Sequence, residues 1–222
     1  MLVAWCFSGI VGFLIGVLAG IYKGSLFDKI VKIFCLALQS APTFWIGLLI
    51  LSLFSVYLGW FPIGFAVPMG KLSLEITIWD RIYHLILPAL TLSILGISRV
   101  TLFTRQKLIE ILNSDFILFA KARGENTRQL VIRHGLRNIA LPAITEQFAS
   151  FSELFGGIAL AETVFSYPGL GTATTAAGLN GDVPLLLGLA IFSAIFVFVG
   201  NFIANILYGV LDPRLKEGKY NG

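Results

Sequence analysis

The chain has 222 residues, of which 57% are hydrophobic and 13% charged, and its mean hydropathy is +0.88. Soluble domains carry about 25% charged residues, so this composition excludes an ordinary soluble enzyme and predicts a polytopic membrane protein. The net charge of +4 is less informative than the positions of the charges. Cys6 and Cys35 lie in apolar runs without metal-binding or redox spacing, which is typical of free buried thiols.

The first apolar run, residues 2–21, is uninterrupted and has about the 20 residues that a bilayer core requires. Gly12, Gly16 and Gly20 recur in it at every fourth position. This spacing places three bare patches on one helix face and predicts a close-packing seam for a neighbouring helix. The alternative is that these glycines are merely tolerated in the membrane.

A second span is expected over residues 30–58, and it contains Gln39, Ser40 and Pro42. Proline removes a backbone donor and clashes with the preceding turn, so a kink at mid-span is predicted. Kinks survive in lipid where neighbours or a water-filled path satisfy the freed carbonyls. Gln39 and Ser40 therefore face either a translocation path or another helix, with which they form ordinary hydrogen bonds.

A mixed loop, residues 63–82, leads into a third span at 83–104. His84 stands at the start of this span, where a single histidine is more often a hydrogen-bonded boundary residue than a metal ligand. The helix continues into Arg99, Arg105 and Lys107, which we group with the basic residues around the polar interval that follows.

The only long polar interval between very apolar segments is the loop 113–138. Asn113 or Ser114 caps a first short helix, and Gly124 stands where a left-handed turn would end it. Asn126 with Gln129 resembles a capping box that starts a second helix, 127–137. Two short helices about a glycine turn form a compact projection outside the bilayer, a geometry suited to docking into another protein.

The fourth span, 139–161, carries unusual polar residues: Glu146, Ser150, Glu153 and Gly157 form one stripe of a 3.6-residue period. A carboxylate at mid-bilayer costs roughly 2.5–3.5 kcal/mol, so the stripe should face a pore, a cavity or a basic partner. An acidic stripe favours a cationic cargo. The alternative is that Glu146 lies near the interface and pairs with Arg137 or a neighbour.

The last span is expected over residues 184–211, after a Pro-Gly turn with aromatic neighbours around Pro168, a composition typical of a membrane interface. If there are five spans, only Lys71 and Arg81 of the 16 basic residues lie opposite the loop 113–138. The positive-inside rule then places this loop and the C-terminus in the cytoplasm and Met1 outside.

Several strings resemble one family. Ala120, Gly124, His134, the run Leu-Arg-Asn at 136–138 and Leu-Pro at 141–142 are similar to the cytoplasmic "EAA" loop of permease subunits of ABC importers. The strings A-K-A-R-G, R-H-G-L-R-N and E-T-V-F-x-Y-P-G-L-G resemble its peptide and nickel branch. Leu118-Phe119-Ala120 stands where the general motif has Glu-Ala-Ala. The alternative for the loop is a basic amphipathic segment on the headgroups.

The resemblance implies an all-α fold: a polytopic transmembrane helical bundle of the type I ABC importer permease, with a coupling loop at 113–138 inside a single domain, 1–222. About five spans are expected where the family has six. The first family span would then be missing because of a truncation, a misplaced start or a split gene.

The resemblance also implies site residues. The ATPase-docking set is Phe116, Ala120, Lys121, Arg123, Gly124, Asn126, Arg128 and His134. The translocation-path set follows instead from the proline kink and the polar stripe, which departs from the mostly small or apolar residues of the family: Gln39, Ser40, Pro42, Glu146, Ser150, Glu153 and Gly157. The outer-mouth set is Glu162, Tyr167, Pro168 and Gly169.

Neither a G-x-x-x-x-G-K-[ST] loop nor a G-x-S-x-G or H-x-x-x-H pattern occurs in the sequence, so the chain itself is not expected to hydrolyse ATP. The resemblance implies that separate subunits do so, and the partners it implies are a second permease subunit, two ABC ATPase subunits, an extracytoplasmic solute-binding protein and the lipid bilayer. No cofactor, metal or nucleic acid is expected. The expected location is the cytoplasmic membrane of a bacterium or archaeon.

The predicted function is to form half of an ATP-driven import pathway, for peptides or alternatively for nickel or another metal complex. A different class is a secondary transporter driven by an ion gradient, in which Glu146 and Glu153 are the ion sites. A third possibility is a truncated remnant that does not transport.

Overall fold

The computed structural model describes residues 1–71 and 74–211, without the side chains of 151–155 and 207–211. Every regular element in this described part is helical, as predicted. The elements are α1 (Leu2–Ile21), α2 (Leu26–Ser40), α3 (Thr43–Leu51), the π-helix η1 (Ser52–Tyr57), α4 (Ile78–Leu112), α5 (Asp115–Ala122), α6 (Thr127–Gln129), the π-helix η2 (Leu130–Gly135), α7 (Leu136–Ala149), α8 (Phe151–Val164), α9 (Leu170–Leu179) and α10 (Val183–Leu211).

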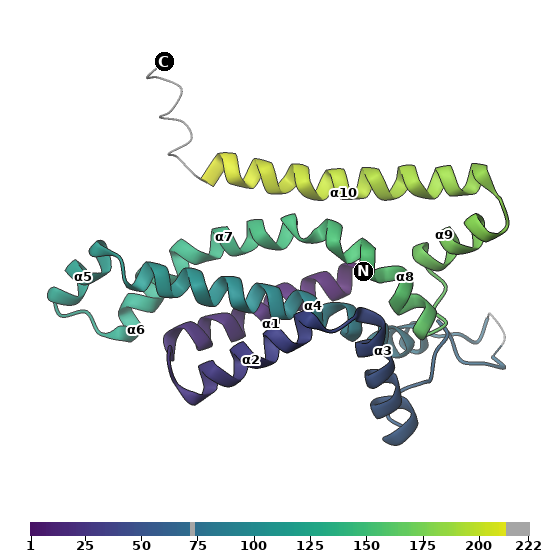
Figure 1. The fold of residues 1–222 in the computed structure, drawn as a ribbon, viewed down its shortest axis with the longest axis horizontal. Coiled ribbons are helices and arrows are strands. Elements are labelled where there is room, and N and C mark those ends of the chain that lie inside the picture. Colours follow the sequence, from purple (N-terminus) through teal and green to yellow (C-terminus); the bar gives the residue numbers. More distant parts are fainter. Residues whose placement is uncertain (72–73, 212–222) are drawn as a thin grey trace, which may run out of the picture.

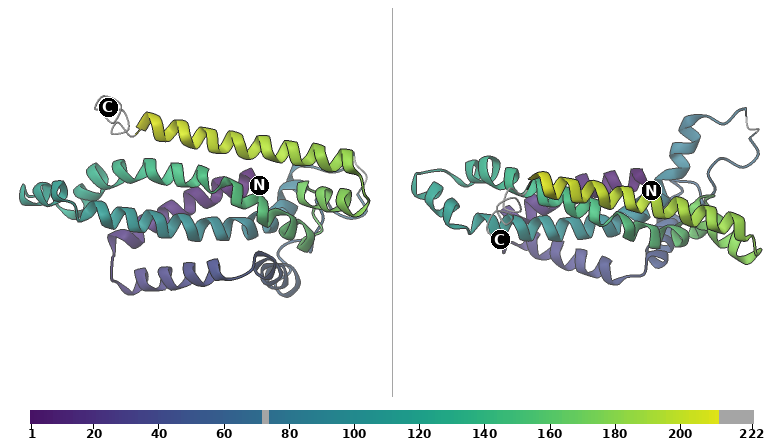
Figure 2. Two further views of the ribbon diagram at one scale, coloured as in Figure 1. Left: turned by 45° about the horizontal axis from the view of Figure 1, so that its top comes forward. Right: turned by 90° about the horizontal axis from the view of Figure 1, so that it is seen from above.

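The long helices lie side by side along one axis of an elongated bundle (Figures 1 and 2). The α1–α2 turn, α5 and α6 lie at one end, and α9 lies at the other. Among the described residues, α1, α4 and the Val183–Ile206 part of α10 are long and apolar enough to cross a membrane. The bent pair of α2 with α3 and η1 is a fourth candidate.

The predicted glycine seam of α1 is confirmed, because it packs directly on α4. A Cβ atom added to Gly16 would lie 2.7 Å from both the Thr101 carbonyl oxygen and Thr104 Cβ. A Cβ atom on Gly12 would lie 2.8 Å from Val100 Cβ. The backbones of α1 and α4 therefore approach more closely than any residue larger than glycine would permit at these positions. The α1–α4 contact is the most extensive helix contact in the described part of the chain.

The helix α2 is held to α4 by a buried ion pair near the α1–α2 turn. Arg105 donates to both carboxylate oxygens of Asp28, with a distance of 2.8 Å from Nη2 to Oδ2. Asp28 is 3% exposed and also accepts from the backbone N–H of Gly24 at 2.8 Å. Two opposite charges that are paired and hydrogen-bonded can remain buried at this depth.

The expected kink at Pro42 is a full break. The helix α2 ends at Ser40, α3 begins at Thr43, and the two axes differ by 109°. Pro42 is extended, with φ −62° and ψ 137°, and is the N-cap residue of α3. Since proline disfavours a helical conformation in the residue before it, the break falls where the sequence places it.

The expected fourth span is also divided. The helix α7 ends and α8 begins at Ser150, and each helix has 14 residues, so neither covers the expected span 139–161. The predicted single stripe is therefore wrong in one respect, because Glu146 lies on α7 and Gly157 on α8.

Replacing Gly16 with alanine should destabilise the bundle by roughly 1–3 kcal/mol, because the added methyl group forces α1 away from α4. Thermal unfolding in detergent measures this loss. Gly188→Ala in α10 is the matched control, since nothing lies within 4 Å of its added Cβ. Equal unfolding temperatures for the two variants would contradict the seam.

Candidate functional site

The projection at one end of the bundle, residues 115–135, is called the knob here. Its small core consists of Ile117, Ala120 and Leu130, which pack against the end of α4. Ala120 is 7% exposed. Ala120 was placed in the docking set, but it belongs to the knob core, where its small side chain lets α5 pack within the knob itself.

The turn of the knob is built as predicted. Gly124 has φ +92° with nothing within 4 Å of an added Cβ, so it provides the left-handed conformation that glycine favours. Asn126 and Gln129 form a reciprocal capping box with two hydrogen bonds of 2.9 Å. Ser114 is the N-cap residue of α5, but its hydroxyl donates backwards to the Ile111 carbonyl.

The second predicted helix of the loop does not end at Arg137. The helical run continues from α6 through η2 into α7. The chain is thus helical from Thr127 to Ala149, and the knob is joined without a hinge loop to a helix of the bundle.

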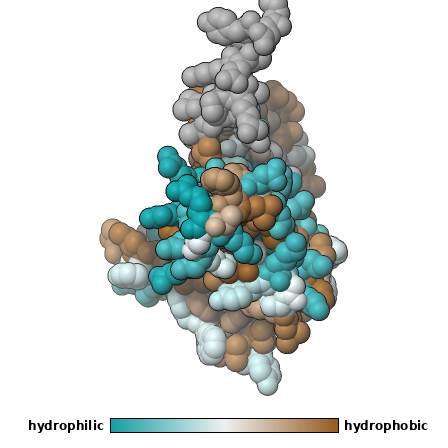
Figure 3. Space-filling view, turned by 90° about the vertical axis from the view of Figure 1, so that its left-hand side faces the viewer, coloured by the Kyte–Doolittle hydropathy of each residue, from teal (hydrophilic) through white to brown (hydrophobic). Residues whose placement is uncertain are grey.

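The surface of the knob is apolar and basic. Figure 3 views the molecule from the end that carries the knob, where brown and teal side chains adjoin. The exposed apolar residues are Phe116, Leu118, Phe119 and Ile132. The exposed polar residues of the predicted docking set are Lys121, Arg123, Asn126 and Arg128. His134 is half-buried, and its Nε2 atom lies 3.2 Å from Glu125 Oε2.

A small pocket of about 140 Å³ lies inside the bundle, where both helix breaks meet α4. It is called the inner pocket here and is lined by Ser8, Thr43, Leu92, Leu95, Gly96, Arg99, Ser150 and Gly157. Arg99 Nε donates to Glu146 Oε1 at 3.2 Å, which joins α4 to α7. A guanidinium group and three hydroxyl groups make this a polar site within an apolar bundle.

The predicted path residues are only partly brought together. Ser150 and Gly157 line the inner pocket, and Glu146 contacts it through Arg99. Gln39 and Ser40 are exposed beside the α2–α3 break, and the Ser40 hydroxyl donates to the Leu36 carbonyl of its own helix at 2.9 Å. Pro42 is exposed directly before Thr43. The side chain of Glu153 lies outside the described residues.

Arg99 is a site residue that sequence reasoning assigned to the wrong place. It was grouped with the basic residues around the loop 113–138, but it lies within α4, roughly 20 Å along the axis from the end at Leu112. The available signal was its position inside the expected third span, four residues after Leu95 in an apolar run.

The predicted outer-mouth residues form a tight turn between α8 and α9. Glu162 Oε2 accepts from the backbone N–H of Thr172 at 2.9 Å and so caps the start of α9. The backbone N–H of Tyr167 donates to the Glu162 carbonyl at 2.8 Å. Gly169 is the N-cap residue of α9. Pro168 is exposed.

His84 is a hydrogen-bonded boundary residue, as predicted. Its Nδ1 atom donates to the carbonyl oxygens of Gly64 at 2.9 Å and Phe65 at 3.1 Å. Within the described part of the chain, no group of three or more His, Cys, Asp or Glu residues is arranged to hold a metal ion.

Residues 12–217 match the family model described as "Binding-protein-dependent transport system inner membrane component". The chain belongs to this family. The membership agrees with the resemblance found in the EAA-like loop and in the E-T-V-F string.

Curated relatives include the oligopeptide transport permease AppB of Bacillus subtilis, which is 39% identical over 79% of this chain and 54% of AppB. The di/tripeptide transport permease DppB of Pseudomonas aeruginosa is 36% identical over 97% of this chain and 69% of DppB. The dipeptide permease DppB of Escherichia coli K12 is 32% identical over the same shares. The chain thus spans about half to two thirds of the length of these relatives.

A solved structure of the methionine ABC transporter MetNI, in inward-facing conformations, has the same fold. Its matching chain superposes with a TM-score of 0.65 at 18% identity and covers 93% of this chain and 91% of its own length.

Replacing Gly171 with alanine should open the α8–α9 turn, because the added Cβ would collide with the backbone of Ala159. Neither the α8 nor the α9 backbone can shift without a cost in free energy, so local unfolding near Phe165 should become several-fold more frequent. The rate of chymotrypsin cleavage at Phe165, which is 1% exposed, measures this. Gly178→Ala in the same helix, with open space around it, should leave the rate unchanged, and equal rates would refute the close contact.

Proposed function

We propose that this permease forms half of the translocation pathway of an ATP-driven ABC importer of peptides and couples to a separate ATPase subunit. The names of its relatives specify oligopeptides, dipeptides and tripeptides. This favours peptides over nickel as the cargo.

The observation that carries the proposal is the mechanical connection of the knob. The knob core packs on Ile111 and Leu112 at the end of α4, and η2 continues directly into α7. A displacement of the knob therefore moves α4 and α7 together. These are the helices that supply Arg99 and Glu146 at the inner pocket.

The partners follow from this mechanism. An ATPase subunit grips the exposed face of the knob, with Phe116, Lys121, Arg123, Asn126 and Arg128 as contacts and Gly124 as the residue that sets the turn. Closure of the ATPase pair then rocks the helices between inward-open and outward-open states. A second permease subunit supplies the other half of the path, and a solute-binding protein delivers peptide at the α8–α9 turn.

The proposed orientation places the knob and the C-terminus in the cytoplasm. Lys23, Lys29 and Lys32 follow α1 or lie on α2, at the end of the bundle that carries the knob. Lys71 and Arg81 lie at the other end, where Lys71 pairs with Asp80 at 3.0 Å. This asymmetry follows the positive-inside rule.

Replacing Gly124 with valine should uncouple transport from ATP hydrolysis. A β-branched residue at φ +92° is strained, so the turn changes shape while the apolar spans still insert. In proteoliposomes that contain the whole importer, peptide uptake per ATP hydrolysed should fall at least tenfold.

Gly181→Val is the matched control, because Gly181 also has positive φ, +68°, and open space but lies between α9 and α10. It carries the same strain away from the knob and should keep the wild-type ratio. Normal coupling in the Gly124→Val importer would count against the docking role.

The Arg99–Glu146 pair should control the charge preference of the pathway. Arg99→Gln removes a positive charge from the inner pocket and should shift uptake towards basic dipeptides, whereas Glu146→Gln removes a negative charge beside it and should shift uptake towards acidic ones. Each shift should be about tenfold, as expected for a charged hydrogen bond. Competition between acidic and basic dipeptides during uptake measures both variants, and shifts in the same direction would exclude this role.

A further inference from the structure

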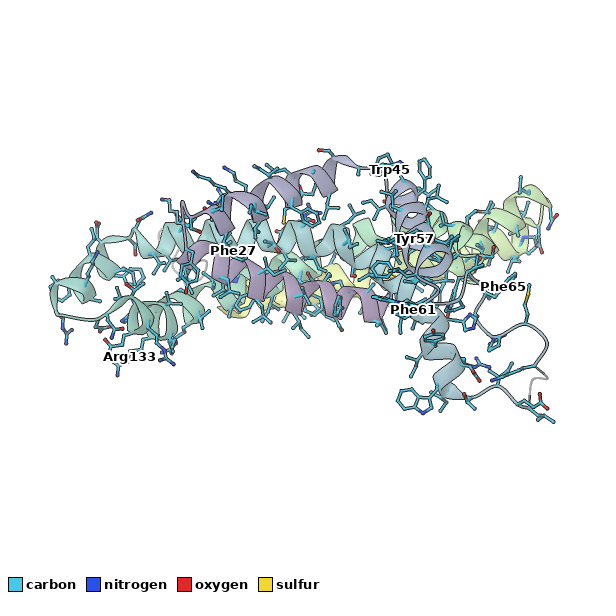
Figure 4. The ribbon with its side chains drawn as sticks, turned by 90° about the horizontal axis from the view of Figure 1, so that it is seen from below. Phe27, Trp45, Tyr57, Phe61, Phe65 and Arg133 are labelled. Atoms are coloured by element: carbon cyan, nitrogen blue, oxygen red, sulfur yellow. The ribbon has the colours of Figure 1, made fainter. Side chains whose placement is uncertain are left out.

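A basic pocket lies where the knob meets the bundle. Arg133 and Arg137, four residues apart, line it together with Phe116, His134 and Asn138. Both arginine side chains are exposed, and neither forms an ion pair with a described residue. Figure 4 shows Arg133 on the outer side of the knob, pointing away from the bundle. The pocket therefore presents two guanidinium groups that can hold an anion.

An apolar groove of about 420 Å³ lies farther along α7, between α7 and α1. Its walls include Phe13 and Leu14 of α1 and Ala140, Ile144 and Phe148 of α7. Ile144 is 46% exposed, so the groove opens to the side of the bundle. Its lining is almost wholly apolar, which suits a hydrocarbon chain.

The basic pocket and the apolar groove lie on one helix face. Arg133, Arg137, Ala140, Ile144 and Phe148 follow at steps of four, three, four and four residues, which is the spacing of one helical stripe. From Arg137 to Phe148 the helix rises roughly 17 Å. Half of a bilayer core measures about 15 Å, so the stripe has the dimensions of one lipid in one leaflet.

We propose that this chain binds one anionic phospholipid of the cytoplasmic leaflet, with its phosphate at Arg133 and Arg137 and an acyl chain in the α1–α7 groove. Guanidinium groups bind phosphate oxygens in a bidentate manner, and the walls of the groove offer the acyl chain van der Waals contacts. The bound lipid joins the base of the knob to α1 and α7, the elements on either side of it.

An acidic surface of the ATPase is the other candidate for the two arginines. Such a surface would occupy only the basic half of the stripe and would leave the groove between α1 and α7 open. The ATPase contacts proposed above include Phe116, which borders the basic pocket, but neither Arg133 nor Arg137. The continuity of charge and groove favours the lipid.

The test measures phosphatidylglycerol retained by the full chain, without ATPase subunits, by native mass spectrometry after titration in neutral detergent. The double variant Arg133→Gln/Arg137→Gln should bind this lipid about thirtyfold more weakly, or about fivefold for each charge removed. Phosphatidylcholine, which carries no net charge, should bind weakly to both proteins.

Arg123→Gln/Arg128→Gln is the matched control, because it removes two exposed charges from the same knob but not from the stripe. It should retain phosphatidylglycerol like the wild type. Ile144→Gln tests the groove and should weaken retention roughly threefold, whereas Ile191→Gln on the exposed face of α10 should not.

Three outcomes would overturn the proposal. In the first, the Arg133/Arg137 variant retains the lipid as the wild type does. In the second, the two double variants lose equal amounts of lipid, and in the third, the Arg133/Arg137 variant retains the lipid but the assembled importer loses its co-purifying ATPase. The second outcome would indicate non-specific attraction, and the third would indicate a protein-docking surface. Since lipid retention is measured on the chain alone, it can fail while the proposed transport function holds.

Discussion

The close approach of α1 to α4 is the constraint on which the rest of the structure depends. Helices in lipid gain little from hydrophobic burial, so van der Waals contact between backbones must supply the association. Gly12, Gly16 and Gly20 leave no side chain of α1 between the two backbones. The seam continues at Ser8, which packs against Gly96 of α4 so closely that a Cβ atom added to Gly96 would lie 2.7 Å from Ser8 Cβ. The helix α4 thereby becomes a fixed axis. The buried Asp28–Arg105 pair attaches α2 to it, and the Arg99–Glu146 pair attaches α7.

Two helix breaks lie beside α4, and both border the inner pocket. Backbone groups freed by a helix break are tolerated at membrane depth only where protein or a water-filled cavity satisfies them. The breaks at Ser40–Thr43 and at Ser150 both contribute a lining residue to the inner pocket. The parts of the bundle that can change shape at least cost are therefore next to Arg99. The knob is connected to the inner pocket through α4 and α7, so a displacement of the knob acts on the inner pocket.

The sequence predicted the elements whose signal is local and missed those that tertiary contacts determine. Gly124, with its positive φ, and the Asn126–Gln129 box follow from turn and capping chemistry within a few residues, and both are confirmed. The glycine seam follows from a four-residue repeat. By contrast, no local pattern distinguishes a kink at Pro42 from a 109° break, because the angle depends on what α3 packs against. Ala120 was assigned to the docking surface because no local pattern shows its burial. It is buried against Leu130 only because η2 brings the chain back against α5. Arg99 was assigned to a loop because positive charges usually mark loops, and its partner Glu146 lies 47 residues away.

The Arg99–Glu146 pair also changes what the acidic residues imply about cargo. Taken alone, a carboxylate stripe favours a cation, but Glu146 is paired with a guanidinium group at 3.2 Å, so its field at the inner pocket is that of a dipole. A paired charge in an apolar bundle seldom adds stability over a well-packed apolar pair, so stability alone does not account for these two residues. A zwitterionic peptide carries one charge of each sign and can therefore contact both members of the pair. The peptide cargo proposed above agrees with this arrangement of charges, and that agreement does not depend on the names of the relatives.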